Sequence, residues 1–286
     1  MTPQLAWECA CLLGEGPVWL EAEQALRFVD IKGRAVLRYD PASGRGERLE
    51  TGGMPSFIYP TDGDALLFGS EQQLKLLYPD GHVETHCDIP EPGRNRTNDG
   101  AVDPDGRLWF GLSDMPEDHP GGELRCYDRG RITRKLDGVT VPNGPAICTE
   151  GRLLYHVDSP NRAIWRFTIA EDGSLTDHLL FTQIEEQAGY PDGVVLDAEG
   201  CLWVALWDGW GVRRYGPDGQ LLDHIPFPCA RVTKLAFGGP DLTTAFITTA
   251  RGGLSEAELA DQPLAGSLFT FESPVAGHHP HRVKLS

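Results

Sequence analysis

The sequence has no long apolar run and no excess of positive charge, and both absences narrow what the chain can do. Its 286 residues include 25 Lys and Arg against 42 Asp and Glu, a formal net charge of −17. This balance argues against nucleic-acid binding, which needs a basic surface for the phosphates. The most hydrophobic runs, such as 202–207, are far shorter than the roughly 20 residues of a membrane-spanning helix. Neither a nucleic acid nor a membrane is therefore expected as a partner.

Neither a leader segment nor a disulfide framework is expected. Residues 1–7 contain neither a basic stretch nor an apolar run, so we do not expect a secretory signal. The seven cysteines are an odd number, and no Cys-x-x-Cys pair occurs. Such a set indicates reduced thiols in strands and a reducing compartment. The sequence predicts a soluble, cytoplasmic protein.

Several catalytic motifs do not occur either. The chain has no Gly-x-Ser-x-Gly elbow, no Gly-x-x-x-x-Gly-Lys-Ser/Thr phosphate loop and no His-Glu-x-x-His pair. Residues 103–106 resemble the start of a calcium loop but lack its later ligands, so they predict a β-turn. No stretch shows a long helical periodicity, and 34 Gly with 22 Pro suits many short strands. These features favour an all-β protein.

What the chain does contain is an internal repeat. Six units are each expected to end in a strand with an aromatic residue before a turn, at intervals of 39 to 54 residues. These aromatics are Tyr39, Tyr78, Tyr127, Phe167, Tyr215 and Phe269. Four strands per unit at this period predict a six-bladed β-propeller, with residues 1–286 as one domain. A β-sandwich, the alternative, gives no reason for repeated segments.

The repeat aligns a set of polar residues. Three of them lie eight positions before a turn glycine: Asn98 before Gly106, Asn143 before Gly151 and Asp192 before Gly200. A looser fourth copy adds Glu15. In a propeller the innermost strand of each blade runs alongside the central channel. Because these residues come just before the expected inner strands, they are predicted to meet at one mouth of the channel.

The chemistry of this set suits a hard cation. Glu15 and Asp192 offer carboxylates and Asn143 an amide carbonyl, and three protein ligands leave positions for water and substrate. The candidates are Ca²⁺, Mg²⁺, Mn²⁺, Zn²⁺ and Fe²⁺. Pro-Asp-Gly is mostly a tight turn and occurs four times here. Asp192 differs because it occupies the place of Asn143 in its unit, and from spacing alone the turn and the metal ligand both remain open.

These residues resemble the SMP-30/gluconolactonase (regucalcin-like) family. The matching motifs are Leu13-Gly14-Glu15-Gly16-Pro17, Phe28-Val29-Asp30-Ile31, Arg96-Thr97-Asn98-Asp99-Gly100, Pro142-Asn143-Gly144 and Tyr190-Pro191-Asp192-Gly193. They cover nearly the whole chain in family order, and 190–264 looks especially like bacterial sugar lactonases, including xylonolactonases. The resemblance implies a six-bladed propeller with one divalent metal held by Glu15, Asn143 and Asp192. It also implies that Arg96 and Asn98 contact the substrate.

One departure concerns substrate preference. Family members often place an acidic substrate contact after the third blade's inner strand, and within 112–117 we align no specific carboxylate. Our hypothesis is hydrolysis of a pentono- or hexonolactone to the aldonic acid, with the carbonyl polarised by the cation and the attacking water held by Asp192. The expected partner is a small-molecule sugar lactone, with no obligate protein partner. Trp207 and Trp210 are candidates for the pocket wall, or simple core or surface aromatics.

Three alternatives come from other functional classes. The first is a calcium-binding regulatory propeller without lactonase turnover. The second is a propeller hydrolase of organophosphates or aryl esters. The third is a protein-interaction propeller, which would need no cation.

Smaller predictions complete the picture. His156 either approaches the channel or is a hydrogen-bonded strand residue, and the histidines at 278–281 belong to a solvated strand or tail. Short helical turns are predicted at 255–259 and 181–186.

Overall fold

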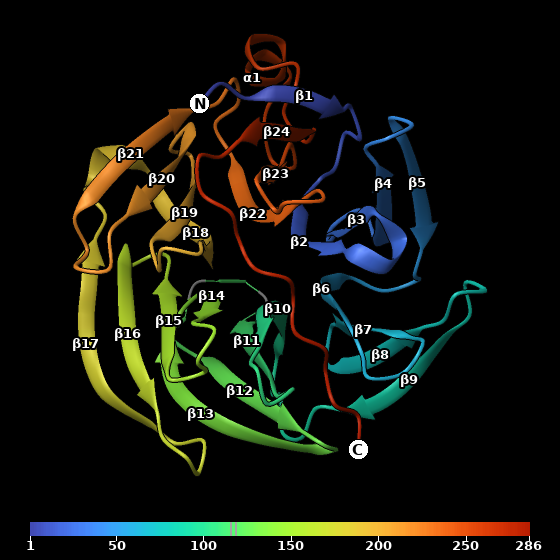
Figure 1. Cartoon of the computed structure of the whole chain (residues 1–286), viewed down its shortest axis with the longest axis vertical. Coiled ribbons are helices and arrows are strands. Elements are labelled where there is room, and N and C mark those ends of the chain that lie inside the picture. The colour runs from blue at the N-terminus through green and yellow to red at the C-terminus, as the bar shows by residue number, and fades with distance from the viewer. Residues whose placement is uncertain (115, 118) are drawn as a thin grey trace.

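The strands form six four-stranded antiparallel sheets in a ring around a central channel (Figure 1). The computed structural model describes residues 1–114, 116–117 and 119–286. The predicted six-bladed β-propeller is confirmed. From the channel outward, blade one consists of β2 (Gly14–Leu20), β3 (Ala25–Asp30), β4 (Ala35–Asp40) and β5 (Arg45–Glu50). Blade two consists of β6 (Pro55–Pro60), β7 (Leu66–Ser70), β8 (Gln73–Leu77) and β9 (Val83–Asp88). Blade three consists of β10 (Asn95–Val102), β11 (Leu108–Asp114), β12 (Gly122–Asp128) and β13 (Arg131–Val139).

The second half of the ring repeats this order until its last blade. Blade four consists of β14 (Pro142–Ile147), β15 (Leu153–Asp158), β16 (Ala163–Ile169) and β17 (Leu175–Gln183). Blade five consists of β18 (Tyr190–Leu196), β19 (Leu202–Trp207), β20 (Gly211–Tyr215) and β21 (Leu221–Pro226). Blade six consists of β22 (Val232–Gly238), β23 (Thr244–Thr249), β24 (Leu268–Glu272) and β1 (Gln4–Trp7). The outermost strand of blade six therefore comes from the N-terminus, with Gln4 opposite Thr270. This pairing closes the ring, and each inner strand contacts the next one around the channel.

The sequence predicted that each unit ends with the strand that carries the aromatic, but each blade has one further strand outside it. Five of the aromatics lie in the third strand of a blade, and Tyr78 directly follows one; these strands are β4, β8, β12, β16, β20 and β24. A fourth strand follows each of them in space. The reason is that the outer strands are half-polar and exposed, as in β5 and β21, so they lack the apolar signal of a buried strand.

The repeat itself has a structural cause in the turn between the first two strands of a blade. Asp103 is fully buried, and its carboxylate accepts hydrogen bonds from the Arg107 backbone N–H at 2.9 Å and from Trp109 Nε1 at 2.8 Å. Asp197 repeats the arrangement with Cys201 N–H at 3.0 Å and Trp203 Nε1 at 2.9 Å. The predicted β-turn at 103–106 is confirmed, because its first carboxylate organises the hairpin.

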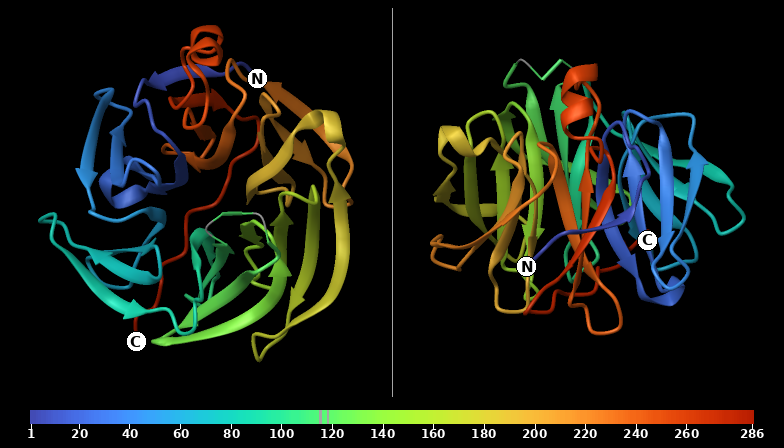
Figure 2. Two further views of the ribbon diagram at one scale, coloured as in Figure 1. Left: turned by 180° about the vertical axis from the view of Figure 1, so that it is seen from behind. Right: turned by 90° about the horizontal axis from the view of Figure 1, so that it is seen from above.

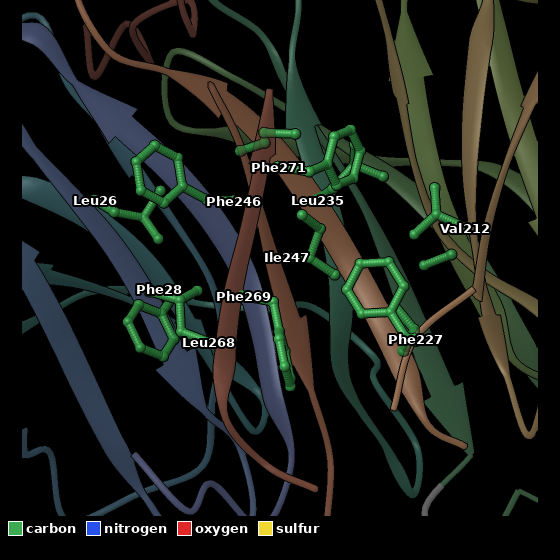
Figure 3. Packing of buried hydrophobic residues seen from close by; sticks show 14 of the residues in the cluster. Leu26, Phe28, Val212, Phe227, Leu235, Phe246, Ile247, Leu268, Phe269 and Phe271 are labelled. Atoms are coloured by element: carbon green, nitrogen blue, oxygen red, sulfur yellow. The ribbon is translucent and has the colours of Figure 1, made fainter. Parts of the chain in front are cut away.

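Apolar side chains fill the spaces between blades. Figure 3 shows the largest cluster, in which Phe246 of β23 faces Leu26 of blade one while Phe227 and Phe269 lie toward blade five. Trp19 stacks on Phe246 with ring centroids 5.6 Å apart. Complete burial of such a side chain contributes about 2–3 kcal/mol. The cluster therefore joins the first and last blades, where the ring closes.

The C-terminal segment crosses the open centre of the ring (Figure 1). Ala276 O accepts from the Ala198 N–H of blade five at 2.8 Å, and Val283 bridges to Thr61 of blade two. Val283 is fully buried, and Lys284 N–H donates to Gly106 O of blade three at 3.0 Å. His278 and His279 are exposed, as the prediction of a solvated segment requires. The segment is nevertheless tied down, because its backbone bonds cross the channel at the end where the inner strands finish.

Helical structure is sparse. The helix α1 (Glu256–Asp261) begins at Ser255, whose side chain and that of Glu258 form a reciprocal capping box, so the first predicted turn is confirmed. The second is wrong: residues 181–183 belong to β17, and a short 3₁₀ helix follows only at Glu186–Ala188. Another 3₁₀ turn lies at Glu21–Glu23. Figure 2 shows α1 and the C-terminal segment at opposite faces of the ring. None of the helices in the described residues could span a membrane.

Candidate active site

The polar residues aligned by the repeat lie within the first halves of inner strands, not before them as the sequence predicted. Glu15 is in β2, Asn98 in β10, Asn143 in β14 and Asp192 in β18, and each is at most 8% exposed. The pairing register shifts at this point in every one of these strands: between Glu15 and Val18, Thr97 and Gly100, Asn143 and Ala146, and Pro191 and Val194. Such irregularities re-aim side chains away from the regular alternation of a sheet.

The two asparagines are joined directly. Asn98 Nδ2 donates to Asn143 Oδ1 at 2.7 Å and to Pro142 O at 3.1 Å. Asn143 Nδ2 donates in turn to Ser159 Oγ at 2.9 Å. These bonds hold the Asn143 amide in one orientation, with its oxygen on the side of Asn98. A carbonyl oxygen has a second lone pair, so Asn143 Oδ1 can also ligate a cation.

Arg96 extends this network toward solvent. Its Nη1 donates to Asn98 Oδ1 and to Thr97 O, both at 2.9 Å, and its Nη2 donates to Glu117 Oε1 at 2.8 Å. The Arg96 side chain is 7% exposed and that of Glu117 is 44% exposed. Glu117 lies in the segment 112–117, in which the sequence identified no specific carboxylate, and residue 115 of that segment lies outside the described residues. The structure thus brings Glu117 to the site by its contact with Arg96.

The two carboxylates of the set are buried and close enough to repel one another. Burial, and next the charge of Asp99, raises the pKa of Glu15 to about 8. Burial, and next the charge of Glu15, raises the pKa of Asp192 well above its usual range. Lys234 opposes both shifts. The positive charge near these carboxylates is therefore smaller than the effect of their burial and mutual repulsion.

Lys234 and Asp99 form a second feature that the sequence did not reveal. Lys234 Nζ donates to Asp99 Oδ1 in a short contact and to Gly100 O at 3.3 Å. Both side chains are at most 5% exposed. Asp99 Oδ2 has no hydrogen-bond partner among the described residues. Lys234 comes from the inner strand of blade six, which carries no copy of the repeated motif.

The donor set fits a hard divalent cation. Glu15 Oε2 accepts from the Gly16 N–H at 2.9 Å, while the Asp192 carboxylate accepts no hydrogen bond from any residue that the structure describes. Two unneutralised carboxylates and an amide oxygen are ligands of the Ca²⁺ and Mg²⁺ type. Within the described ranges, no group of three or more His, Cys, Asp or Glu gathers as a metal site, so the set depends on the Asn143 amide as its third ligand.

The remaining candidates lie apart from this network. His156 is a residue of β15 and pairs with Trp165 across the sheet. Its ring is 1% exposed, and neither ring nitrogen has a hydrogen-bond partner in the part of the chain that the structure describes, so the predicted side-chain hydrogen bond is absent there. Trp207 is the cross-strand neighbour of Tyr190, and the Arg231 guanidinium lies 4.8 Å from its ring centroid. Trp210 is 45% exposed. Trp207 is thus paired with a residue that lies two positions before Asp192 in the neighbouring strand. Trp210 is a surface aromatic.

Comparison with known proteins places this geometry in a family. A sequence profile of the SMP-30/Gluconolactonase/LRE-like region matches residues 13–251. The chain belongs to this family.

Two relatives of the SMP-30/gluconolactonase family illustrate the similarity. The chain is 37% identical to a 6-deoxy-6-sulfogluconolactonase from Pseudomonas putida over 93% of each chain. It is 32% identical to the pentonolactonase XacC from Haloferax volcanii, over 99% of this chain and 98% of that one. Both names describe lactonases, enzymes that hydrolyse a cyclic ester.

A solved structure of the family has nearly the same fold. The calcium-binding protein regucalcin from Agrobacterium tumefaciens superposes with a TM-score of 0.93 and 27% identity, covering 97% of this chain and 96% of that one. The family resemblance inferred from the sequence motifs is confirmed.

Proposed function

We propose that this protein hydrolyses a sugar lactone, a pentono- or hexonolactone, to the open-chain aldonic acid. The observation that carries the proposal is a group of buried carboxylate, amide and guanidinium side chains at one end of the channel: Glu15, Asn143 and Asp192 with Arg96 and Asn98. The lactonase names of two relatives that align over nearly their full length support the same reaction class.

In this proposal Glu15, Asn143 and Asp192 hold one divalent cation. When bound, the cation supplies Lewis acidity that polarises the lactone carbonyl and stabilises the negative charge on its oxygen. The buried carboxylates favour such an ion, since their mutual repulsion is relieved by a positive charge between them. The calcium-binding regucalcin structure, similar over almost the whole chain, supports a cation of this class.

The chain's own polar groups position the sugar. Arg96 is held by Glu117 and Asn98, so its guanidinium is oriented before a substrate arrives. A planar fork of N–H donors suits the vicinal hydroxyls of a sugar ring, and the Asn98 amide adds a further polar contact. Fixing the ring in this way places the carbonyl carbon at the mouth of the channel, where a positioned water can attack.

Asp192 is the candidate for holding that water. As water adds to the carbonyl carbon, a proton passes from the water to the carboxylate, and the bond to the ring oxygen then breaks. The ring oxygen takes up the proton held by the carboxylate as it departs, and it becomes a hydroxyl of the open-chain acid. A carboxylate that ligates a cation is a weaker base than a free one, so the main role of Asp192 in this proposal is to hold and orient the water.

A second function has one specific observation in its favour. The similarity to a calcium-binding regucalcin allows cation binding without turnover. The polar pair of Arg96 and Glu117 favours a polyhydroxylated substrate over an aryl ester or an organophosphate.

The seven free cysteines support a reducing compartment, and on that ground we propose a cytoplasmic location.

Acid release at constant pH tests the proposal. Metal-stripped protein would be assayed against pentono- and hexonolactones, with and without Ca²⁺, Mg²⁺, Mn²⁺, Zn²⁺ and Fe²⁺. We expect turnover that a divalent ion restores and that Asp192→Asn abolishes. Asp218→Asn is a matched control, because it alters the exposed Pro-Asp-Gly turn of the same blade. Tight Ca²⁺ binding without turnover of any lactone would instead support the binding function.

A further inference from the structure

A buried lysine spans the channel below the proposed cation site. Lys234 leaves the inner strand of blade six and reaches Asp99 in blade three, on the opposite side of the ring. Its ammonium also donates to Gly100 O at 3.3 Å, and the Tyr59 hydroxyl donates to the same oxygen at 2.6 Å. Lys234 is 4% exposed and Asp99 is 2% exposed. A buried charged pair of this kind is costly to form and needs a compensating use.

The path of the lysine is shaped by the residue that follows Asp192. A Cβ atom at Gly193 would lie 2.5 Å from Lys234 Cγ and 2.6 Å from its Cβ. Only glycine therefore leaves room for the aliphatic stem at this point. The stem passes beside Gly193, the residue that directly follows the proposed ligand Asp192, so the position of the ammonium is tied to the site.

The Lys234 ammonium changes the net charge of the buried groups at the mouth of the channel. Glu15, Asp99 and Asp192 interact electrostatically with one another and with Lys234. Arg96 is neutralised by its own partner, Glu117, at 2.8 Å. Carboxylates ligate a cation in their ionised form, so around a bound ion three carboxylates and one ammonium leave two negative charges, which matches the charge of one divalent cation. Without the lysine the count would be three.

We propose that Lys234 is a built-in countercharge that matches the channel mouth to one divalent cation. It is a positioning residue, because it touches Asp99 and the Gly100 carbonyl rather than the cation or the substrate. The inference rests on the proposed cation, and it adds a reason why the site would prefer an ion of charge two. The lysine excludes a further positive charge, whether carried by a second ion or by an ion of higher valence.

Ion selectivity tests this role without using turnover. Metal-stripped full-length protein would be titrated calorimetrically with Ca²⁺ and, separately, with La³⁺, a trivalent ion that also prefers oxygen ligands. Lys234→Met keeps an unbranched stem against Gly193 but removes the charge. We expect the preference for La³⁺ over Ca²⁺ to rise at least about tenfold, since one uncompensated negative charge favours the ion of higher charge. The double variant Lys234→Met/Asp99→Asn should return to the wild-type preference.

Two further variants keep the test decisive. Asp99→Asn alone should shift the preference in the opposite direction, toward Ca²⁺, and it remains informative if Lys234→Met does not fold. Lys32→Met removes an exposed lysine, changes the total charge by the same amount and should leave the preference unchanged. An unaltered preference in folded Lys234→Met, or an equal change in Lys32→Met, would overturn the inference. If wild-type protein took up neither ion, the proposed cation would fail, and this inference with it.

Discussion

Replacing His156 should stabilise the protein, and increasingly so as the pH falls. The imidazole is buried in β15 with neither nitrogen hydrogen-bonded within the described residues. A buried polar group without a partner costs about 1–3 kcal/mol. In His156→Leu this cost disappears, and the leucine has a volume close to that of histidine. The residue takes no part in the proposed chemistry, so activity should be retained.

The dependence on pH follows from the imidazole's charge. Burial lowers the pKa of His156 from an ordinary value of 6.5 to about 4. Between these values the unfolded chain binds a proton that the folded protein does not, so the stability of the wild type falls as the pH drops. Each pH unit in this window costs about 1.4 kcal/mol. The wild type should therefore lose about 2 kcal/mol by pH 5 and about 3 kcal/mol by pH 4 through this side chain.

Thermal unfolding at pH 7.5, 6 and 5 measures the effect. The difference in Tm between His156→Leu and wild type should grow by about 4 °C from pH 7.5 to pH 5. A steric misfit of the leucine would shift both ends of the series equally, so the growth is the diagnostic quantity. His82→Leu removes an exposed histidine and serves as the control. A difference in Tm that stays constant with pH would refute this account of His156.

Other predictions concern the site and the C-terminal segment. Glu15→Gln and Asp192→Asn should each abolish the rise in Tm on adding Ca²⁺ and lower kcat at least about 10²-fold, measured by scanning fluorimetry and acid release, because each removes a charged ligand. Arg96→Met should lower kcat/KM about 10- to 100-fold while cation binding measured by calorimetry persists, since a charge-assisted hydrogen bond contributes about 1.5–3 kcal/mol. Deleting residues 276–286 should lower Tm by several degrees, because the fully buried Val283 and its backbone bonds across blades two and three are lost. An unchanged Tm in the deletion would show that this segment does not brace the ring.

The repeated parts of the molecule were predictable from the sequence. Asp103 and Asp197 hold their hairpins through contacts within a few residues, so the pattern that produces them is visible as a short motif. Glu15, Asn143 and Asp192 stand at equivalent places in such units, and ring symmetry then predicts that they meet. Local motifs plus symmetry were sufficient for the fold and for the proposed ligand set.

The parts that escaped prediction depend on contacts between distant segments. Lys234 looks like any residue of a buried strand, and only the closed ring places it opposite Asp99. Glu117 reaches Arg96 from an irregular loop whose course no periodic pattern describes. The pairing of β1 with β24 joins the first strand of the chain to the last, and short polar strands carry little signal of their partners.

Crystals soaked in Mn²⁺, with an anomalous difference map recorded near the manganese edge, would test the central claim most directly. Our account predicts one strong peak at the mouth of the channel, at about 2.2 Å from carboxylate oxygens of Glu15 and Asp192 and from Asn143 Oδ1. It also predicts that the peak is lost in Asp192→Asn and retained in Asp218→Asn. An empty mouth in the wild type, with manganese bound only elsewhere, would contradict the assignment of this site.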